Sequence, residues 1–306
     1  MLGTRIITAV ILLIVLGGAL ALPTPWPFML LLSLLTGLGL WEWLRLTSSV
    51  QSAPAVSSNP AEPKAAGGAI VAGLAAGALT VMVTWIWLSD QAYNIGPVAV
   101  TYEIATRVLI PLAAALWILA GTYQVVRGDV KAPAANPFMS LFGILALLAT
   151  WSSLALMFIM GKGLLLLTFL AIIWCADIGA YFAGRAFGKR KLAPRVSPGK
   201  SWEGAIAGVV AAVVWGAATM GWEGSFANHL FRSWSYAALP WVAFIAMLSI
   251  VGDLFESLLK RRAGMKDSSG LLPGHGGVLD RIDAILPTAP LALMLLIHGI
   301  SYEYIP

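Results

Sequence analysis

The stretch SLLKRRAGMKDSSGLLPGHGGVLDRID, residues 257–283, is a polar run set between two long apolar segments, residues 239–258 and 285–302. Each apolar segment is close to the roughly 20 residues that a helix needs to cross the hydrocarbon core of a bilayer. The polar run combines cations, carboxylates and glycines, which can contact phosphate, a divalent metal and a closely approaching ligand. The stretch therefore predicts two transmembrane helices joined by a chemically active loop.

The rest of the chain resembles these flanking segments. Of its 306 residues, 59% are hydrophobic and 11% are charged, against about 25% charged in soluble domains. The apolar runs are continuous rather than alternating, which argues against a transmembrane β-barrel. We expect an all-α fold, a polytopic membrane helix bundle with about nine transmembrane helices. The predicted spans are residues 6–22, 28–46, 67–88, 108–125, 138–159, 163–183, 204–220, 239–258 and 285–302.

A single integral-membrane domain, residues 1–306, is the simplest organisation. Its first part, residues 1–160, holds the N-terminal spans and a Ser/Pro/Ala-rich segment, residues 47–66, which is expected to be a flexible loop dispensable for catalysis. Its second part, residues 161–306, holds the helices and cytoplasmic loops that are expected to carry the chemistry.

Charge placement predicts the orientation of the chain. Most Lys and Arg residues fall on one side of the nine-span map, and the positive-inside rule assigns that side to the cytoplasm. The N-terminus is then cytoplasmic and the C-terminus lies outside. The net charge of +5 reports this topology rather than a nucleic-acid partner, so none is expected. One alternative stays open, because Arg5, the first apolar run and the small residues 19–21 also resemble a cleavable secretory signal.

Asp253 lies inside an apolar run, about two turns before Lys260. An ionisable group there is costly and usually faces a partner or a wet cavity. On a helix, Asp253, Ser257 and Lys260 occupy positions i, i+4 and i+7 of one face. A salt bridge to a neighbouring basic residue is the alternative. Because Asp177, Asp280 and Asp283 are expected near the same membrane face, the carboxylates could form a Mg²⁺ site.

The turn at residues 273–277, PGHGG, cannot be regular helix, and its glycines permit close contact with a ligand such as phosphate. His275 could hydrogen-bond phosphate or the turn backbone, or act as a base. A base is not required, because a phosphate monoester is largely ionised at neutral pH.

A second basic cluster, residues 185–200, precedes the turn SPGKSWEG at residues 197–204. Ser201 stands before Gly204 and an apolar helix, with Lys200 beside it, which is a plausible anion site at a helix N-terminus. The alternatives are that these charges only anchor topology, or that they hold anionic lipid headgroups.

These residues resemble the signature of phosphatidate cytidylyltransferases, also called CDP-diacylglycerol synthases. That pattern reads Ser-x-apolar-Lys-Arg, then Lys-Asp, then His-Gly-Gly-apolar-x-Asp-Arg-apolar-Asp. Here its positions are Ser257, Leu259, Lys260, Arg261, Lys266, Asp267, His275, Gly276, Gly277, Val278, Asp280, Arg281, Ile282 and Asp283. The similarity extends upstream to Asp177 and residues 197–204, where Ser201 replaces the usual threonine. It covers roughly the C-terminal 40% of the chain.

The resemblance implies that phosphatidate and CTP give CDP-diacylglycerol and pyrophosphate, with Mg²⁺ required, in membrane lipid at the cytoplasmic face of a bacterial inner (plasma) membrane. It implies that Asp253 and Asp280 carry the metal centre, and we expect Asp177 and Asp283 to be further ligands or supports. The residues expected to bind the triphosphate are Lys260, Arg261, Lys266 and Arg281. Those expected to contact substrate phosphate or line the site are Ser197, Lys200, Ser201, Ser257, His275, Gly276 and Gly277. It also suggests a homodimer.

Two other classes of function stay open. Intramembrane carboxylates beside cations also suit a proton-coupled transporter of an anionic solute. Such a transporter would place its charges near the midplane, whereas here they lie toward the cytoplasm. An inactive family member acting as a membrane scaffold is less favoured, because every signature carboxylate and cation is present.

Overall fold

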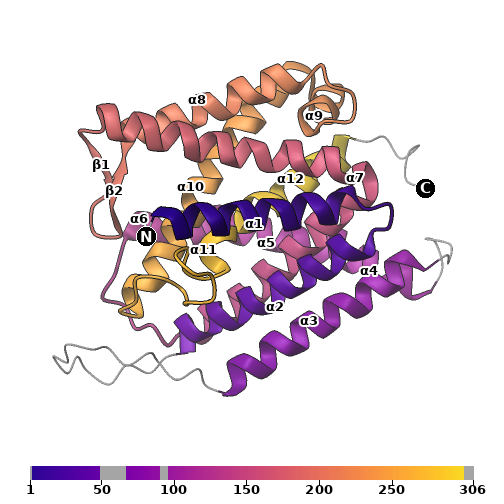
Figure 1. Cartoon of the computed structure of the whole chain (residues 1–306), viewed down its shortest axis with the longest axis horizontal. Coiled ribbons are helices and arrows are strands. Elements are labelled where there is room, and N and C mark those ends of the chain that lie inside the picture. The colour runs from indigo at the N-terminus through magenta and orange to yellow at the C-terminus, as the bar shows by residue number, and fades with distance from the viewer. Residues whose placement is uncertain (1, 49–66, 90–95, 300–306) are drawn as a thin grey trace.

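The computed structural model describes residues 2–48, 67–89 and 96–299, which form a bundle of long helices with one small hairpin at one end (Figure 1). The elements in chain order are α1 Leu2–Ala21, α2 Trp26–Ser48, α3 Gly67–Leu88, α4 Pro97–Glu103, the π-helix η1 Ile104–Leu109, α5 Ile110–Leu116, the π-helix η2 Trp117–Gly121, α6 Thr122–Arg127, α7 Pro137–Phe187, β1 Lys191–Ala193, β2 Ser197–Ser201, α8 Trp202–Thr219, α9 Phe226–Trp234, the 3₁₀ turn η3 Ser235–Ala237, α10 Ala238–Arg262, α11 Leu279–Ile282 and α12 Ile285–Gly299.

Seven helical stretches in the described residues are long and apolar enough to cross a membrane: Trp26–Ser48, Gly67–Leu88, Pro97–Arg127, Pro137–Gly161, Gly163–Phe187, Trp202–Thr219 and Phe226–Arg262. They confirm the all-α polytopic bundle. The predicted first and ninth spans correspond to α1 and α12, which are not among the seven. The total of about nine and the cytoplasmic N-terminus remain predictions.

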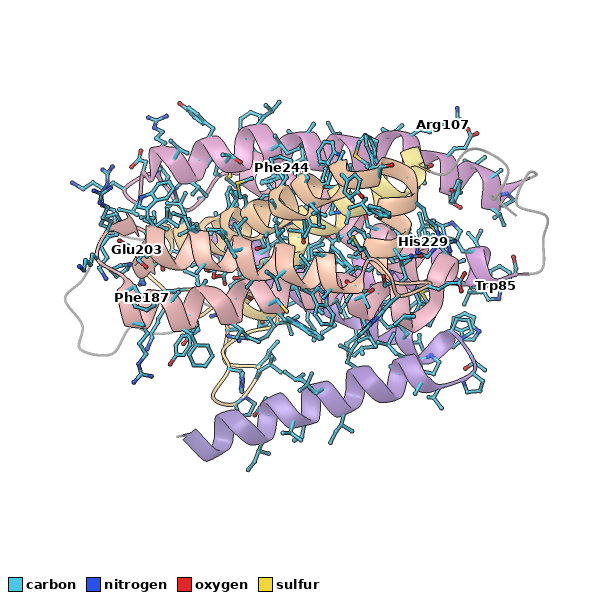
Figure 2. All side chains as sticks on the ribbon, turned by 90° about the horizontal axis from the view of Figure 1, so that it is seen from above. Trp85, Arg107, Phe187, Glu203, His229 and Phe244 are labelled. Carbon is cyan, nitrogen blue, oxygen red and sulfur yellow. The ribbon has the colours of Figure 1, made fainter. Side chains whose placement is uncertain are left out.

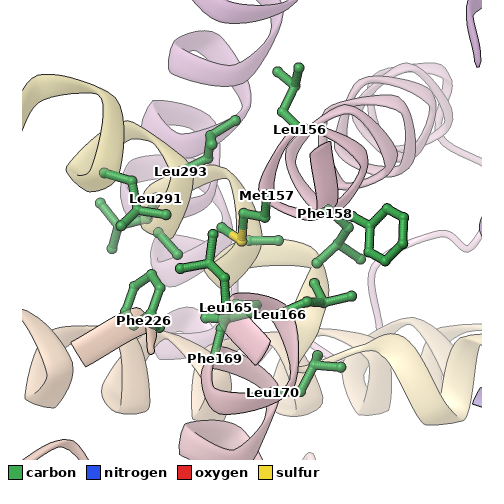
Figure 3. Close-up of a cluster of buried hydrophobic side chains, with 14 of the residues drawn as sticks. Leu156, Met157, Phe158, Leu165, Leu166, Phe169, Leu170, Phe226, Leu291 and Leu293 are labelled. Carbon is green, nitrogen blue, oxygen red and sulfur yellow. The ribbon is translucent and has the colours of Figure 1, made fainter. Parts of the chain in front are cut away.

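The chain reverses direction inside α7, between its two spanning halves. A Cβ added at Gly161 would lie 2.5 Å from Leu165 Cβ, whereas residues four apart in a regular helix have Cβ atoms about 5–6 Å apart. Figure 3 shows Met157 from the first half facing Leu165 and Leu166 from the second. These side chains lie in one buried cluster, so the two halves pack against each other as predicted for separate spans.

Two boundaries differ from those expected. Thr47 and Ser48 belong to α2 rather than to a flexible loop, because Thr47 is buried, donates to Trp43 O at 3.1 Å and lies 2.9 Å from Ser140 Oγ. The remainder of the expected loop, residues 49–66, falls outside the described residues. Helix α10 continues to Arg262, so Lys260 is helical and its position relative to Asp253 is fixed.

The polar ends of the bundle match the charge map. Figure 2 shows Glu203 and Phe187 at one end of the molecule, and Arg107, His229 and Trp85 at the other. The basic segment around the β1–β2 hairpin therefore lies opposite the residues that the sequence placed on the far side. Near the basic end, an aromatic cluster of Trp43, Trp117, Phe142 and Phe255 packs α2, η2, α7 and α10 together.

Candidate active site

A cavity of about 510 Å³ lies between the second half of α7, the end of β2, the start of α8 and the middle of α10. Its polar lining comes from segments far apart in sequence: Asp177, Tyr181, Arg185, Lys200, Ser201 and Asp253. Four of these, Asp177, Lys200, Ser201 and Asp253, are predicted site residues, and the fold brings them to one hollow at the basic end of the bundle.

Inside this cavity, Lys200 Nζ lies 2.6 Å from Asp253 Oδ2, and the two side chains are 26% and 36% exposed. The salt bridge that the sequence left as an alternative is therefore present, with a partner from strand β2. Both groups remain open to the cavity. Asp177 is exposed there as well. The arrangement places two carboxylates and one ammonium where an anionic ligand with its counter-cation could enter.

The cavity wall depends on close packing of α7 against α8. A Cβ added at Gly204 would lie 2.8 Å from Ala180 O, and one at Gly208 would lie 2.6 Å from Ala176 O. Small residues are needed here because the two backbones nearly touch, as at close helix crossings in membranes. This contact holds Asp177, on α7, beside the N-terminus of α8.

The β1–β2 hairpin positions Lys200. Ser201 caps α8 by accepting a hydrogen bond from Gly204 N at 3.2 Å, as N-cap serines commonly do. Glu203 accepts hydrogen bonds from Lys189 N and Arg190 N, both at 3.2 Å. The carboxylate thereby ties the end of α7 to the start of α8 and fixes the loop that carries Lys200.

A second polar group is buried next to the loop of residues 263–278, between α10 and α11. Lys260 Nζ lies 2.5 Å from both Glu256 Oε2 and Asp280 Oδ1. Glu256 is 2% exposed and, although paired in charge with Lys260, neither of its oxygens has a well-aligned hydrogen-bond donor. Lys260 therefore links the transmembrane helix α10 to the short helix α11.

Asp280 is held firmly in this group. Its Oδ2 accepts hydrogen bonds from Gly277 N at 2.7 Å, Ser268 N at 2.9 Å and Ser268 Oγ at 2.8 Å. Burial alone would raise the pKa of Asp280, but its hydrogen bonds and Lys260 outweigh that effect and hold the pKa below its usual range. Both oxygens are engaged, so Asp280 becomes available to a metal only if Lys260 leaves Oδ1.

The glycines of the 273–277 turn have a packing role. Gly274 and Gly276 have positive φ angles of 75° and 80°, which favour glycine. A Cβ at Gly276 would lie 2.6 Å from Asp280 Oδ2, and one at Gly277 would lie 2.5 Å from Glu42 Oε1. The close partners of this turn are thus the Ser268 hydroxyl and carboxylates of the chain itself. Its predicted role as a phosphate cradle stays a prediction.

Asp283 lies between the two polar groups. Burial and the nearby Asp253 carboxylate raise the pKa of Asp283. The backbone also comes close here, since a Cβ at Gly252 would lie 2.8 Å from Pro287 Cγ. The predicted set Asp177, Asp253 and Asp283 is therefore brought toward one region, while Asp280 faces Lys260.

The remaining predicted residues surround these groups. Arg261 Nε donates to Val196 O at 3.3 Å, tying α10 to the hairpin turn. His275 Nδ1 is buried and has no hydrogen-bond partner. Lys266 and Arg281 are exposed, and Ser197 and Ser257 are half-buried.

Two acidic residues of the buried group, Glu42 and Glu256, were missed in the sequence. Glu256 is three residues after Asp253 and four before Lys260, so helical spacing places it on the stripe already singled out. Glu42 stands inside the apolar run of α2, and a carboxylate at such a position is itself a signal of function. Within the described residues, no three or more His, Cys, Asp or Glu side chains are arranged to hold a metal ion.

The long apolar helices define an integral membrane protein, in which lysines and carboxylates form ion pairs near one end of the bundle. The chain belongs to the cytidylyltransferase family, whose model matches residues 3–298.

The names of its relatives give a particular activity within this family. The chain is 40% identical over 300 residues to the phosphatidate cytidylyltransferase of Pseudomonas aeruginosa, covering 97% of both chains. It is 35% identical over 309 residues to that of Haemophilus influenzae, covering 95% of this chain and 96% of the other. With the Bacillus subtilis enzyme of the same name it is 39% identical over 131 residues, 41% of this chain and 44% of the other.

Proposed function

We propose that this protein is a phosphatidate cytidylyltransferase that converts CTP and phosphatidate to CDP-diacylglycerol and pyrophosphate in phospholipid biosynthesis. The observation that carries the proposal is the cavity at the basic end of the bundle, where Asp177, Lys200 and Asp253 meet, in a chain aligned almost end to end with relatives of that name.

In this reaction a phosphate oxygen of phosphatidate forms a bond to the α-phosphorus of CTP, and the bond from that phosphorus to the bridging oxygen breaks. The leaving group is pyrophosphate. The nucleophile is already largely ionised at neutral pH, so the chain's task is positioning and charge stabilisation. Lys200, Ser197 and Ser201 would bind substrate phosphate. The triphosphate of CTP would be bound by four cations, Lys260, Arg261, Lys266 and Arg281. Ser257 and His275 would lie near it.

We propose Mg²⁺ as the ion for this cavity, because it commonly takes one or two carboxylates and fills its other positions with water and phosphate oxygens. Asp253 and Asp177 are the carboxylates open to the cavity, and Asp283 would support them. Asp280, also a predicted ligand, would need to exchange Lys260 for the ion. When bound, the ion would stabilise negative charge that develops on the transferring phosphate.

The proposed setting is the cytoplasmic face of a bacterial inner membrane. The relatives are bacterial, and the cavity lies at the end of the bundle that carries the basic hairpin. Lipid substrate would reach the site from the surrounding membrane lipids. We also propose that the protein forms a homodimer, and this proposal rests only on the family resemblance.

The test uses purified detergent-solubilised protein with phosphatidate, Mg²⁺ and labelled CTP or labelled ATP, and it follows lipid-extractable nucleotide with and without a chelator. The proposal expects chelator-sensitive CDP-lipid from CTP. If folded protein yields no product with either nucleotide, the proposed activity is wrong, and the transporter or scaffold hypothesis is favoured.

A further inference from the structure

We propose that Glu42, on the N-terminal helix α2, is a positioning residue for the transfer reaction, because it fixes the loop that carries Asp280 to its place beside Lys260. This inference rests on the proposed function. Glu42 lies outside the C-terminal signature, yet its side chain is fully buried, with 0% exposure, against that loop.

Four donors converge on the Glu42 carboxylate. Its Oε1 accepts from Ser269 Oγ at 2.5 Å and Val278 N at 3.0 Å. Its Oε2 accepts from Ser268 Oγ at 3.0 Å and Leu279 N at 2.6 Å. The donors come from both ends of the 268–279 segment, so one side chain holds the loop closed. Gly277 completes the fit, because a Cβ there would collide with the carboxylate.

The carboxylate is connected directly to the Lys260 group through Ser268. The Ser268 hydroxyl lies 3.0 Å from Glu42 Oε2 and 2.8 Å from Asp280 Oδ2, and its single proton serves one of them at a time. Ser268 N also donates to Asp280 Oδ2 at 2.9 Å. Movement of the loop away from Glu42 would therefore displace Asp280 and, with it, the contact to Lys260 Nζ.

Both oxygens are needed as acceptors, which separates this role from simple space filling. In Glu42→Gln one oxygen becomes an NH₂ donor that faces a serine hydroxyl and a backbone N–H. The hydroxyl can rotate and accept, but Val278 N or Leu279 N would lose its partner. A buried N–H left without a partner is unfavourable, which favours release of this end of the loop, although the side chain keeps its size.

The experiment compares wild type, Glu42→Gln and the control Glu103→Gln, whose carboxylate is exposed beside Arg107 at 3.4 Å. We expect Glu42→Gln to lower kcat by about tenfold or more while the KM for phosphatidate stays within about twofold, because a displaced Asp280–Lys260 pair weakens the transition state more than lipid binding. Glu103→Gln should match wild type.

Loop position is measured independently of activity. Val278, 2% exposed, is changed to Cys in a Cys175→Ser background, and its rate of maleimide labelling is recorded with Glu42 or Gln at position 42. Faster labelling at a temperature well below the melting transition shows local release of the loop, whereas a labelling rate equal to that with Glu42 contradicts the positioning role, whatever the melting temperature.

The outcomes separate the two proposals. An inactive wild type would overturn the proposed function. An active wild type together with wild-type kcat and slow labelling in Glu42→Gln would overturn the positioning role. If Glu42→Gln does not fold, Ser268→Ala and Ser269→Ala each remove one donor and keep the carboxylate. Unchanged kcat in both of these variants would also overturn it.

Discussion

The ion pair between Lys200 and Asp253, at 2.6 Å, joins a residue of strand β2 to a carboxylate inside a membrane-spanning helix. Asp253→Asn removes the charge and keeps the shape, so we expect kcat to fall by at least about 100-fold while the protein still inserts and folds. The measurement is CDP-lipid formation by detergent-purified variants. Glu223→Gln, at an exposed carboxylate, is the control and should be fully active. Near-normal turnover in both Asp253→Ala and Asp280→Ala would refute the metal assignment.

Asp280 gives a pH prediction for stability. Its folded-state pKa lies below the ordinary value of 3.8, so the folded state binds fewer protons than the unfolded state as the solution is acidified. The stabilisation from this group is present above that value and is lost as pH falls below it. We expect the melting temperature of the wild type to drop between about pH 5 and pH 3, and that of Asp280→Asn to drop less. Parallel curves for the two proteins would contradict this.

Gly277 and Gly270 provide a matched pair of glycine substitutions. A Cβ at Gly277 would meet Ser268 and Glu42, whereas one at Gly270 would meet nothing within 4 Å. Gly277→Ala should cost about 1–3 kcal/mol of stability through overpacking and should lower activity. Gly270→Ala should do neither. Thermal unfolding and turnover of the two purified variants check this, and equal behaviour would show that the turn has room to adjust.

At the scale of elements, the junction of β2 and α8 depends on the Ser201 cap. Ser201→Ala removes the acceptor for Gly204 N and should cost about 1 kcal/mol. It should also raise the KM for phosphatidate, because Lys200 precedes the cap. Ser201→Thr keeps the hydroxyl and should therefore retain the wild-type stability and the wild-type KM for phosphatidate. Melting temperature and KM of the two variants measure this, and equal effects of Ala and Thr would argue against capping.

At the scale of the whole molecule, the charges at the two ends of the bundle predict which end faces the cytoplasm and which faces the exterior. Lys189 belongs to the basic end, and Glu223 has a side chain that is 88% exposed on the side that the charge map assigns to the exterior. In a Cys175→Ser background, a membrane-impermeant maleimide added to intact cells should label Glu223→Cys and spare Lys189→Cys. Lysed cells should show labelling of both. The reverse pattern in intact cells would invert the proposed topology.

The elements themselves were largely predictable from sequence, because each span is long, apolar and bounded by polar residues. The predictions failed only at the boundaries and local geometry of some helices. Residues 97–127 form a longer helical run than expected, with two π-helical segments, and α10 extends one turn further, to Arg262. Polar residues at the end of an apolar run carry no periodic signal that distinguishes a last helical turn from a loop.

The sequence by itself determined the membrane class, the family signature and the carboxylates and cations that carry it, because these follow from composition and local spacing. Tertiary structure alone decided which of them meet. It pairs Asp253 with Lys200 and Asp280 with Lys260, although helical spacing had placed Asp253 and Lys260 on one stripe. It also brings Glu42 across more than two hundred residues to the signature loop. Such contacts arise from packing between helices, which the local pattern of a single chain does not encode.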